Sequence, residues 1–137
     1  MIFKTGGFKA YERVTNTDLE KLVCQGTVSV SIRINNCLKS YKSGILYDGD
    51  GKCGCTSSVG GTNHAVAIVG FGEEKEYIIA QGNSTAAAPC RKYWLVKNSW
   101  GPEWGENGFF RICREDDKFT FGTCNIRSEP MIPLRLP

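Results

Sequence analysis

The sequence predicts a mainly β domain of the α+β class, with an antiparallel sheet or barrel and one short helix on its flank. About six strand-like segments recur along the chain without the strand–helix alternation that a parallel sheet requires. Only one stretch has apolar residues at helical spacing. The length of 137 residues suits a single domain with its own core.

The predicted helix follows an opening strand at residues 8–14. Thr17 and Glu20 have the spacing of a capping box, in which each side chain bonds the other residue's backbone N–H, so the helix is predicted to begin there. Its apolar stripe consists of Leu19, Leu22 and Val23. Gly26 is suited to close the helix. Cys24 falls in this stripe, which predicts a buried, inert thiol.

The remaining elements are predicted strands and loops. Apolar and polar residues alternate from Val28 to Ile34, which predicts a half-buried strand, and His64 to Phe71 is apolar enough to predict a buried one. The other predicted strands are residues 76–80, 93–97, 108–114 and 131–136, the last an edge strand bounded by prolines. Loops are predicted at residues 35–61, 81–91 and 98–107.

The composition excludes two classes of partner. The net charge of +3 is small and the basic residues are scattered, whereas a nucleic-acid surface needs them clustered. No apolar run approaches the roughly 18 residues needed to span a bilayer. The chain is therefore predicted to bind neither nucleic acid nor membrane.

Cysteine usage points to an oxidising compartment. Seven cysteines are many for this length, and the odd number leaves one thiol free or paired outside the chain. Asn83 begins an acceptor pattern for N-glycosylation, which agrees with a secretory route. The first seven residues have no apolar region after their charge, so we expect the targeting sequence to lie outside this chain.

Two long motifs carry the chemistry. The first surrounds the only histidine: Gly61-Thr62-Asn63-His64-Ala65-Val66. The second is Lys97-Asn98-Ser99-Trp100-Gly101, followed by Trp104-Gly105-Glu106-Asn107-Gly108. In this order they resemble the two signatures of the papain-like cysteine peptidases of the cathepsin L-like type. The resemblance covers nearly the whole chain. It implies the C-terminal, right-hand lobe of that fold, with residues 1–14 as a connecting strand region, residues 15–137 as the barrel lobe, and the left-hand helical lobe absent.

The resemblance implies a role for three residues of these motifs. His64 is the imidazole that holds a cysteine as thiolate and later protonates the leaving amine. Asn98 accepts a hydrogen bond from the other ring nitrogen and fixes the orientation of the ring. Trp100 lies over this contact and keeps water away, while Trp104 is expected to be structural. No cofactor is implied.

The nucleophile of the family is missing from this sequence. In the family it lies in a Cys-Gly-Ser/Ala-Cys-Trp/Tyr segment about 130–150 residues before the histidine. Only 63 residues precede His64, and no such segment or preceding oxyanion-hole glutamine occurs among them. Cys24 with Gln25 and Gly26 is no substitute. We therefore expect the chain to be inactive alone and to need a left-hand lobe, with peptides or proteins as substrates and a lysosomal, vacuolar or secreted location.

The resemblance also implies a specificity pocket and a disulfide. Ser31 and Ala65 are expected to line the pocket for the second side chain upstream of the cut, with Glu129 at its floor. A carboxylate there accepts an arginine as well as an apolar side chain. An exposed Glu129 near the C-terminus is the alternative. Cys124 is expected to pair with Cys53 or Cys55.

Two alternatives accompany this interpretation. Cys53, Cys55 and His64 with a fourth ligand resemble a zinc site, but the spacing is not that of a standard finger and the family motif already explains His64, so we predict no metal. The chain as a whole is an enzyme half, a non-catalytic binding module or decoy, or a product without function. The joint presence of His64, Asn98 and Trp100 favours the enzyme half.

Overall fold

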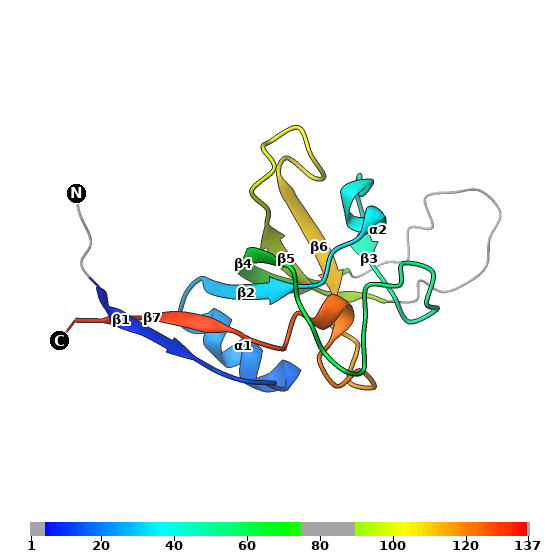
Figure 1. Ribbon diagram of the computed structural model, residues 1–137. Coiled ribbons are helices and arrows are strands. Elements are labelled where there is room, and N and C mark those ends of the chain that lie inside the picture. The colour runs from blue at the N-terminus through cyan, green and yellow to red at the C-terminus, as the bar shows by residue number, and fades with distance from the viewer. Residues whose placement is uncertain (1–4, 75–89, 137) are drawn as a thin grey trace.

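The computed structural model describes residues 5–74 and 90–136 (Figure 1). In chain order the elements are β1 (Thr5–Ala10), α1 (Asn16–Gln25), β2 (Val28–Ile32), α2 (Asn36–Lys39), β3 (Ile45–Leu46), β4 (His64–Glu73), β5 (Lys92–Lys97), β6 (Phe109–Cys113), the 3-10 helix η1 (Thr123–Asn125) and β7 (Met131–Arg135). The predicted strand at residues 76–80, the glycosylation candidate Asn83 and most of the predicted loop at residues 81–91 lie outside the described residues. The mainly β fold with few helices is confirmed.

Helix α1 begins two residues earlier than the capping-box pattern predicts. Its N-cap is Thr15, whose hydroxyl oxygen accepts a hydrogen bond from the Asp18 backbone N–H at 3.1 Å. The predicted cap at Thr17 is therefore wrong. Asn16 is buried and its amide donates to Asp116 Oδ1 at 2.7 Å, a contact from far along the chain that the local pattern cannot reveal. Gly26 ends the helix, as predicted, and its N–H donates to the Val23 carbonyl.

The prediction of a buried thiol at Cys24 is wrong. Leu19, Leu22 and Val23 turn inward and are at most 8 % exposed, whereas Cys24 is exposed and free. One residue advances a helix by about 100°, so Cys24, next to Val23, leaves the buried stripe.

The described strands form one open sheet in the order β1-β7-β2-β4-β5-β6-β3. All pairs are antiparallel except β3 with β6, which is parallel. Strand β7 was predicted to be an edge strand, and this is wrong, because it lies between β1 and β2. It meets β2 only where Met131 faces Ser29, so one of its sides is almost unpaired and a proline is tolerated at position 133.

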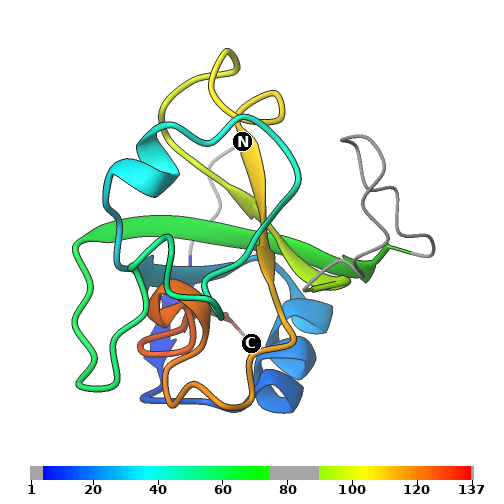
Figure 2. The ribbon, with the colours of Figure 1, turned by 90° about the vertical axis from the view of Figure 1, so that its right-hand side faces the viewer.

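Strand β4 runs across the middle of the molecule and is covered by α1 on one side (Figure 2). Its inward side chains join a core of completely buried residues, which includes Leu19, Val28, Ile32, Ile68, Trp94, Val96, Phe110, Ile112 and Ile126. The segment predicted as loop, residues 35–61, also contains the four-residue helix α2 and the two-residue strand β3. None of the helices among the described residues is long and apolar enough to cross a membrane.

A buried ion pair ties the C-terminal segment to the start of α1. Asp116 is 1 % exposed and Arg127 is 5 % exposed, and Arg127 Nε lies 3.7 Å from Asp116 Oδ1. The other Asp116 oxygen accepts from the Thr123 backbone N–H at 2.6 Å. Arg127 also donates to the Val14 carbonyl at 2.8 Å. Because Val14 lies 113 residues before Arg127 and Asn16 lies 100 residues before Asp116, these contacts hold together parts of the chain that are distant in sequence.

Candidate active site

His64 and Asn98 meet because β4 and β5 are antiparallel neighbours. His64 is the first residue of β4, and Asn98 follows the last residue of β5. The register pairs Ala67 with Lys97, which brings the start of one strand beside the end of the other. His64 Nε2 lies 2.8 Å from Asn98 Oδ1. Asn98 is 6 % exposed, whereas His64 is half-buried and keeps one side toward solvent.

The hydrogen bonds around Asn98 assign the imidazole tautomer. Asn98 Oδ1 also accepts from the Ser99 backbone N–H at 2.8 Å. A backbone N–H only donates, so this amide atom is the oxygen, and His64 Nε2 must be the donor. Nδ1 of the neutral ring is then the basic nitrogen. Among the described residues it has no hydrogen-bond partner, so it is free to take a proton from a thiol that comes within hydrogen-bonding distance.

Trp100 lies against the His64 ring, with ring centroids 5.1 Å apart and planes tilted by 34°. Trp104 stands edge-on to Trp100 at 5.1 Å and packs in turn on Phe110 of the core at 5.6 Å. Trp100 is 36 % exposed, so the indole covers one face of the imidazole while its own outer face remains open. The two tryptophans thus connect the histidine to the core of the sheet.

Glu106 anchors the loop that carries Asn98 and Trp100, a role that the sequence did not predict. Its carboxylate accepts from Arg111 Nε and Nη2 at 3.0 and 2.9 Å and from the Gly44 backbone N–H at 3.0 Å. Tyr41 lies beside it and donates its hydroxyl to the Gly44 carbonyl at 2.6 Å. Glu106 lies within the second motif, and this position was the signal in the sequence that it has a role in the site. Its hydrogen-bond partners Arg111 and Gly44 lie outside that motif, so the motif could not show what Glu106 binds.

Burial and the hydrogen bonds of this cluster shift the pKa values of Glu106, Arg111 and Tyr41. Burial alone would raise the pKa of Glu106, but the hydrogen bonds from Arg111 and Gly44 outweigh it and the pKa lies below its ordinary value. The hydrogen bond to Glu106 raises the pKa of Arg111. Burial raises the pKa of Tyr41 to about 12. At neutral pH the site loop is therefore held by an ionised Glu106 and a neutral tyrosine.

Glu106 is expected to make folding pH-dependent in the acid range. Because its folded pKa is depressed, its stabilisation is complete above the unfolded value of about 4.3 and is lost as pH falls through the folded pKa. Thermal midpoints measured from pH 7 to pH 3 should fall less steeply below pH 5 for Glu106→Gln than for the unaltered chain. Glu103→Gln, at an exposed position of the same loop, is the control and should follow the unaltered curve.

The structure brings together two of the three residues assigned to the specificity pocket. Ser31 on β2 and Ala65 on β4 are direct cross-strand partners, one position from the pair that contains His64. Glu129 is exposed and lines a groove of about 600 Å³ with Thr62, two residues before His64. Ser31 and Ala65 do not line that groove. Met131 on β7 faces Ser29 on β2 in an antiparallel register. If this register continued before the start of β7, Glu129, two residues before Met131, would face Ser31, two residues after Ser29.

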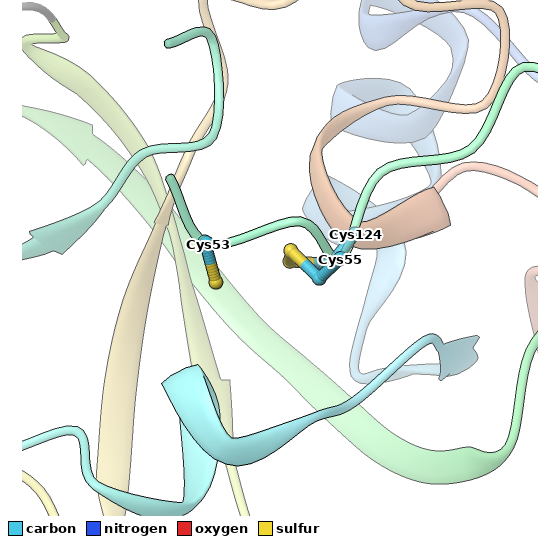
Figure 3. A group of neighbouring side chains, drawn as sticks. All are labelled: Cys53, Cys55 and Cys124. Atoms are coloured by element: carbon cyan, nitrogen blue, oxygen red, sulfur yellow. A yellow bond between two sulfur atoms is a disulfide. The ribbon is translucent and has the colours of Figure 1, made fainter. Parts of the chain in front are cut away.

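The structure pairs six of the seven cysteines. The disulfides are Cys37–Cys53, Cys55–Cys124 and Cys90–Cys113. Cys55 is thus the partner of Cys124, and Cys53, the other candidate, bonds elsewhere. The zinc alternative combined Cys53 and Cys55 with His64. In the structure, the sulfur atoms of Cys53 and Cys55 lie within 4.8 Å of the sulfur of Cys124 instead (Figure 3).

Comparison with known proteins agrees with this geometry. The family described as papain family cysteine protease matches residues 2–134. Falcipain-2b of Plasmodium falciparum is 36 % identical over 93 % of this chain and 24 % of its own length. The viral cathepsin of Cydia pomonella granulosis virus is 38 % identical over 77 % of this chain and 25 % of its own length. The chain therefore spans about a quarter of the length of these curated relatives.

Solved structures of similar proteins have the same fold over nearly all of the chain. The bromelain protease from Ananas comosus, in complex with an inhibitor, is 27 % identical with a TM-score of 0.74, covering 96 % of this chain and 51 % of that one. A ragweed pollen allergen cysteine protease in its proform is 29 % identical with a TM-score of 0.73, covering 98 % of this chain and 34 % of that one. With the family match spanning almost every residue, the chain belongs to the papain family of cysteine proteases.

Proposed function

We propose that this chain supplies the histidine and the asparagine of a papain-like cysteine peptidase. His64 takes the proton of a cysteine thiol on Nδ1 and later gives it to the leaving amine of the cleaved peptide. The contact of 2.8 Å between His64 Nε2 and Asn98 Oδ1 carries this proposal, because it leaves Nδ1 as the basic nitrogen. A neutral amide suits the role, since the thiolate and the imidazolium already balance each other's charge. Trp100 shields the contact from water on one face.

The nucleophile, in this proposal, comes from polypeptide outside these 137 residues. Six of the seven cysteines are in disulfides, and the seventh, Cys24, is on α1. The sequence has no Cys-Gly-Ser/Ala-Cys-Trp/Tyr segment. Residues 15–137 then form the right-hand lobe, residues 1–14 form its connection to a left-hand lobe, and the half-buried His64 faces the groove between the two. The chain alone is inactive.

Reconstitution tests this proposal. The chain is purified free of host proteases and mixed or co-expressed with the left-hand lobe of a papain-family relative, and hydrolysis of a fluorogenic peptide amide is measured. We expect no turnover from either part alone. The pair should hydrolyse the substrate, and a thiol alkylator should abolish the activity. Sequencing the DNA before the Met1 codon for a Cys-Gly-Ser-Cys-Trp segment is an independent check.

Two results would overturn it. Robust, alkylator-sensitive turnover by the chain alone would show that the nucleophile is within it. A stably associated pair that carries both lobes but never hydrolyses peptides would favour a non-catalytic binding module. Association is followed by size-exclusion chromatography, so that failure to assemble is distinguished from failure to catalyse.

Glu129 is proposed to select arginine at the second residue upstream of the cut. In the reconstituted peptidase, Glu129→Gln should lower kcat/KM for an arginine substrate by about tenfold relative to a leucine substrate, since a hydrogen bond to a charged group contributes about 1.5–3 kcal/mol and Glu129 is exposed. Glu115→Gln, another exposed glutamate, is the control. An unchanged arginine-to-leucine ratio in Glu129→Gln would assign Glu129 to the solvent surface instead.

The three disulfides support the proposal that the protein has a lysosomal, vacuolar or secreted location. Three disulfides in a chain of this size require an oxidising environment while the protein folds, which the secretory route provides. The peptidase would act on peptide or protein substrates there.

A further inference from the structure

Asn63, the residue before the histidine, binds the backbone just beyond β2 with its side chain. Asn63 Oδ1 accepts a hydrogen bond from the Ile34 backbone N–H at 2.7 Å, and Asn63 Nδ2 donates to the Ile34 carbonyl at 3.2 Å. We propose that Asn63 is a positioning residue, which fixes the end of β4 so that His64 keeps its contact with Asn98. This inference rests on the proposed function of His64.

The side chain of Asn63 extends the contact between β2 and β4 beyond their last residue pair. The two strands pair as far as Ile32 with His64. The Asn63 backbone N–H then donates to the Ile32 carbonyl at 2.9 Å, and its side chain binds both backbone groups of Ile34. A carboxamide has donors and an acceptor, so it can bind one residue as an opposite strand residue would. The start of β4 is therefore held on both sides of Ile32.

The backbone that Asn63 binds is itself held on both sides. The Arg33 backbone N–H donates to the Cys124 carbonyl at 2.8 Å, and Asn35 Nδ2 donates to the Cys53 carbonyl at 2.6 Å. The side chain of Ile34, between them, packs against the hydrophobic core. Ile34 is therefore a fixed point, and a residue that shares two hydrogen bonds with it is held in place.

The chain that enters β4 does little to fix the histidine. Gly60 and Gly61 have φ values of 80° and 99°, in the left-handed region that glycine adopts without steric cost. Glycine restricts the backbone less than any other residue, so its ordering costs the most conformational entropy. The contact between His64 Nε2 and Asn98 Oδ1 at 2.8 Å, in contrast, requires a defined position of the ring. The hydrogen bonds of Asn63 lie between the glycines and the ring, where they hold the backbone.

Kinetics of the reconstituted peptidase test the proposal. Asn63→Ala removes both side-chain hydrogen bonds and should lower kcat by about tenfold with little change in KM, because a displaced base affects the chemical step more than substrate binding. Asn63→Asp keeps an acceptor for the Ile34 N–H and should retain more of the rate than Asn63→Ala. Asn36→Ala is the matched control and should not change the rate. Asn36 is exposed and accepts hydrogen bonds with its backbone carbonyl, which alanine keeps.

Nuclear magnetic resonance of the 137-residue chain gives a readout that needs no second lobe. His64 is the only histidine, so its ring nitrogens give one set of signals. At a pH where the ring is neutral, the unaltered chain should carry the proton on Nε2, which is bonded to Asn98. Asn63→Ala should raise the fraction that carries the proton on Nδ1. The Ile34 amide, which loses its acceptor, should exchange faster with solvent in the same sample.

The two measurements separate the positioning role from the proposed function. An inactive pair of unaltered lobes would count against the proposed function, and the ring signals would still show whether Asn63 positions the imidazole. Ring nitrogen signals of Asn63→Ala that match those of the unaltered chain would overturn the proposal. An unchanged kcat of Asn63→Ala in an active pair, measured well below the thermal midpoint of every variant, would overturn it as well.

Discussion

Replacing His64 with alanine should lower kcat/KM of the reconstituted peptidase by about 10⁴-fold, because the thiol loses both its base and the charge that keeps it ionised. His64 is half-buried and starts a strand, and its main polar contact is to Asn98, so the substitution should hardly change folding. Peptide hydrolysis and the thermal midpoint of the same preparation are measured together. The rate of thiol alkylation against pH gives a second readout: the reactive thiolate seen near neutral pH should disappear in His64→Ala.

Neighbouring substitutions make this expectation specific. Asn98→Ala should keep part of the activity, because the base remains and only its orientation is lost. Lys97→Ala, adjacent in sequence but exposed, should behave as the unaltered chain. If His64→Ala retained the full rate and the same alkylation profile, another group would be the base and the contact between His64 and Asn98 would be structural.

The largest loss of stability is expected from Asp116→Ala. It removes the carboxylate that faces the buried Arg127 and also accepts from the Thr123 N–H and the Asn16 amide. A buried guanidinium without its counter-charge costs about 3–5 kcal/mol, which is a large part of the stability of a domain of this size. The free energy of unfolding is measured by urea denaturation of the oxidised chain.

Asp117→Ala is the matched control. Asp117 also accepts from the Asn16 amide, at 3.1 Å, but it is exposed, so its loss should cost less than about 1 kcal/mol. The double variant Asp116→Ala/Arg127→Met should recover part of the loss, because it removes the unpaired charge instead of leaving it buried. Equal unfolding free energies for Asp116→Ala and Asp117→Ala would contradict an important role for the buried pair.

Local patterns predicted much of the sheet. The period-two alternation at residues 28–34 anticipated β2, which has one buried face. The apolar run from His64 anticipated the strand β4, but the prediction that it is buried is wrong, because Val69 and Phe71 are 40 % and 38 % exposed. Predictions failed where distant residues decided the outcome. Asn16, in the first turn of α1, is held by Asp116 from far along the chain, and β7 is interior because β1 adds to its outer side.

The residues of the candidate site also divide into those that could be predicted from local patterns and those whose role depends on distant residues. His64, Asn98 and Trp100 could be named from two motifs, since a single sequence already shows residue types and their order. Glu106 was missed because its importance comes from Arg111, Gly44 and Tyr41, which only folding brings beside it. Of the two candidate partners for Cys124, spacing could not choose, because Cys53 and Cys55 are two residues apart and both sulfurs reach the same cluster.

Residue type, order and short-range periodicity were enough to predict the fold class, the base with its orienting amide, and the lack of the family's nucleophile segment within the 137 residues. Two further properties needed the folded chain: which ring nitrogen of His64 is basic, and which cysteines pair. The physical reason is that distances of a few ångströms between residues from distant segments are set by the packing of the whole sheet.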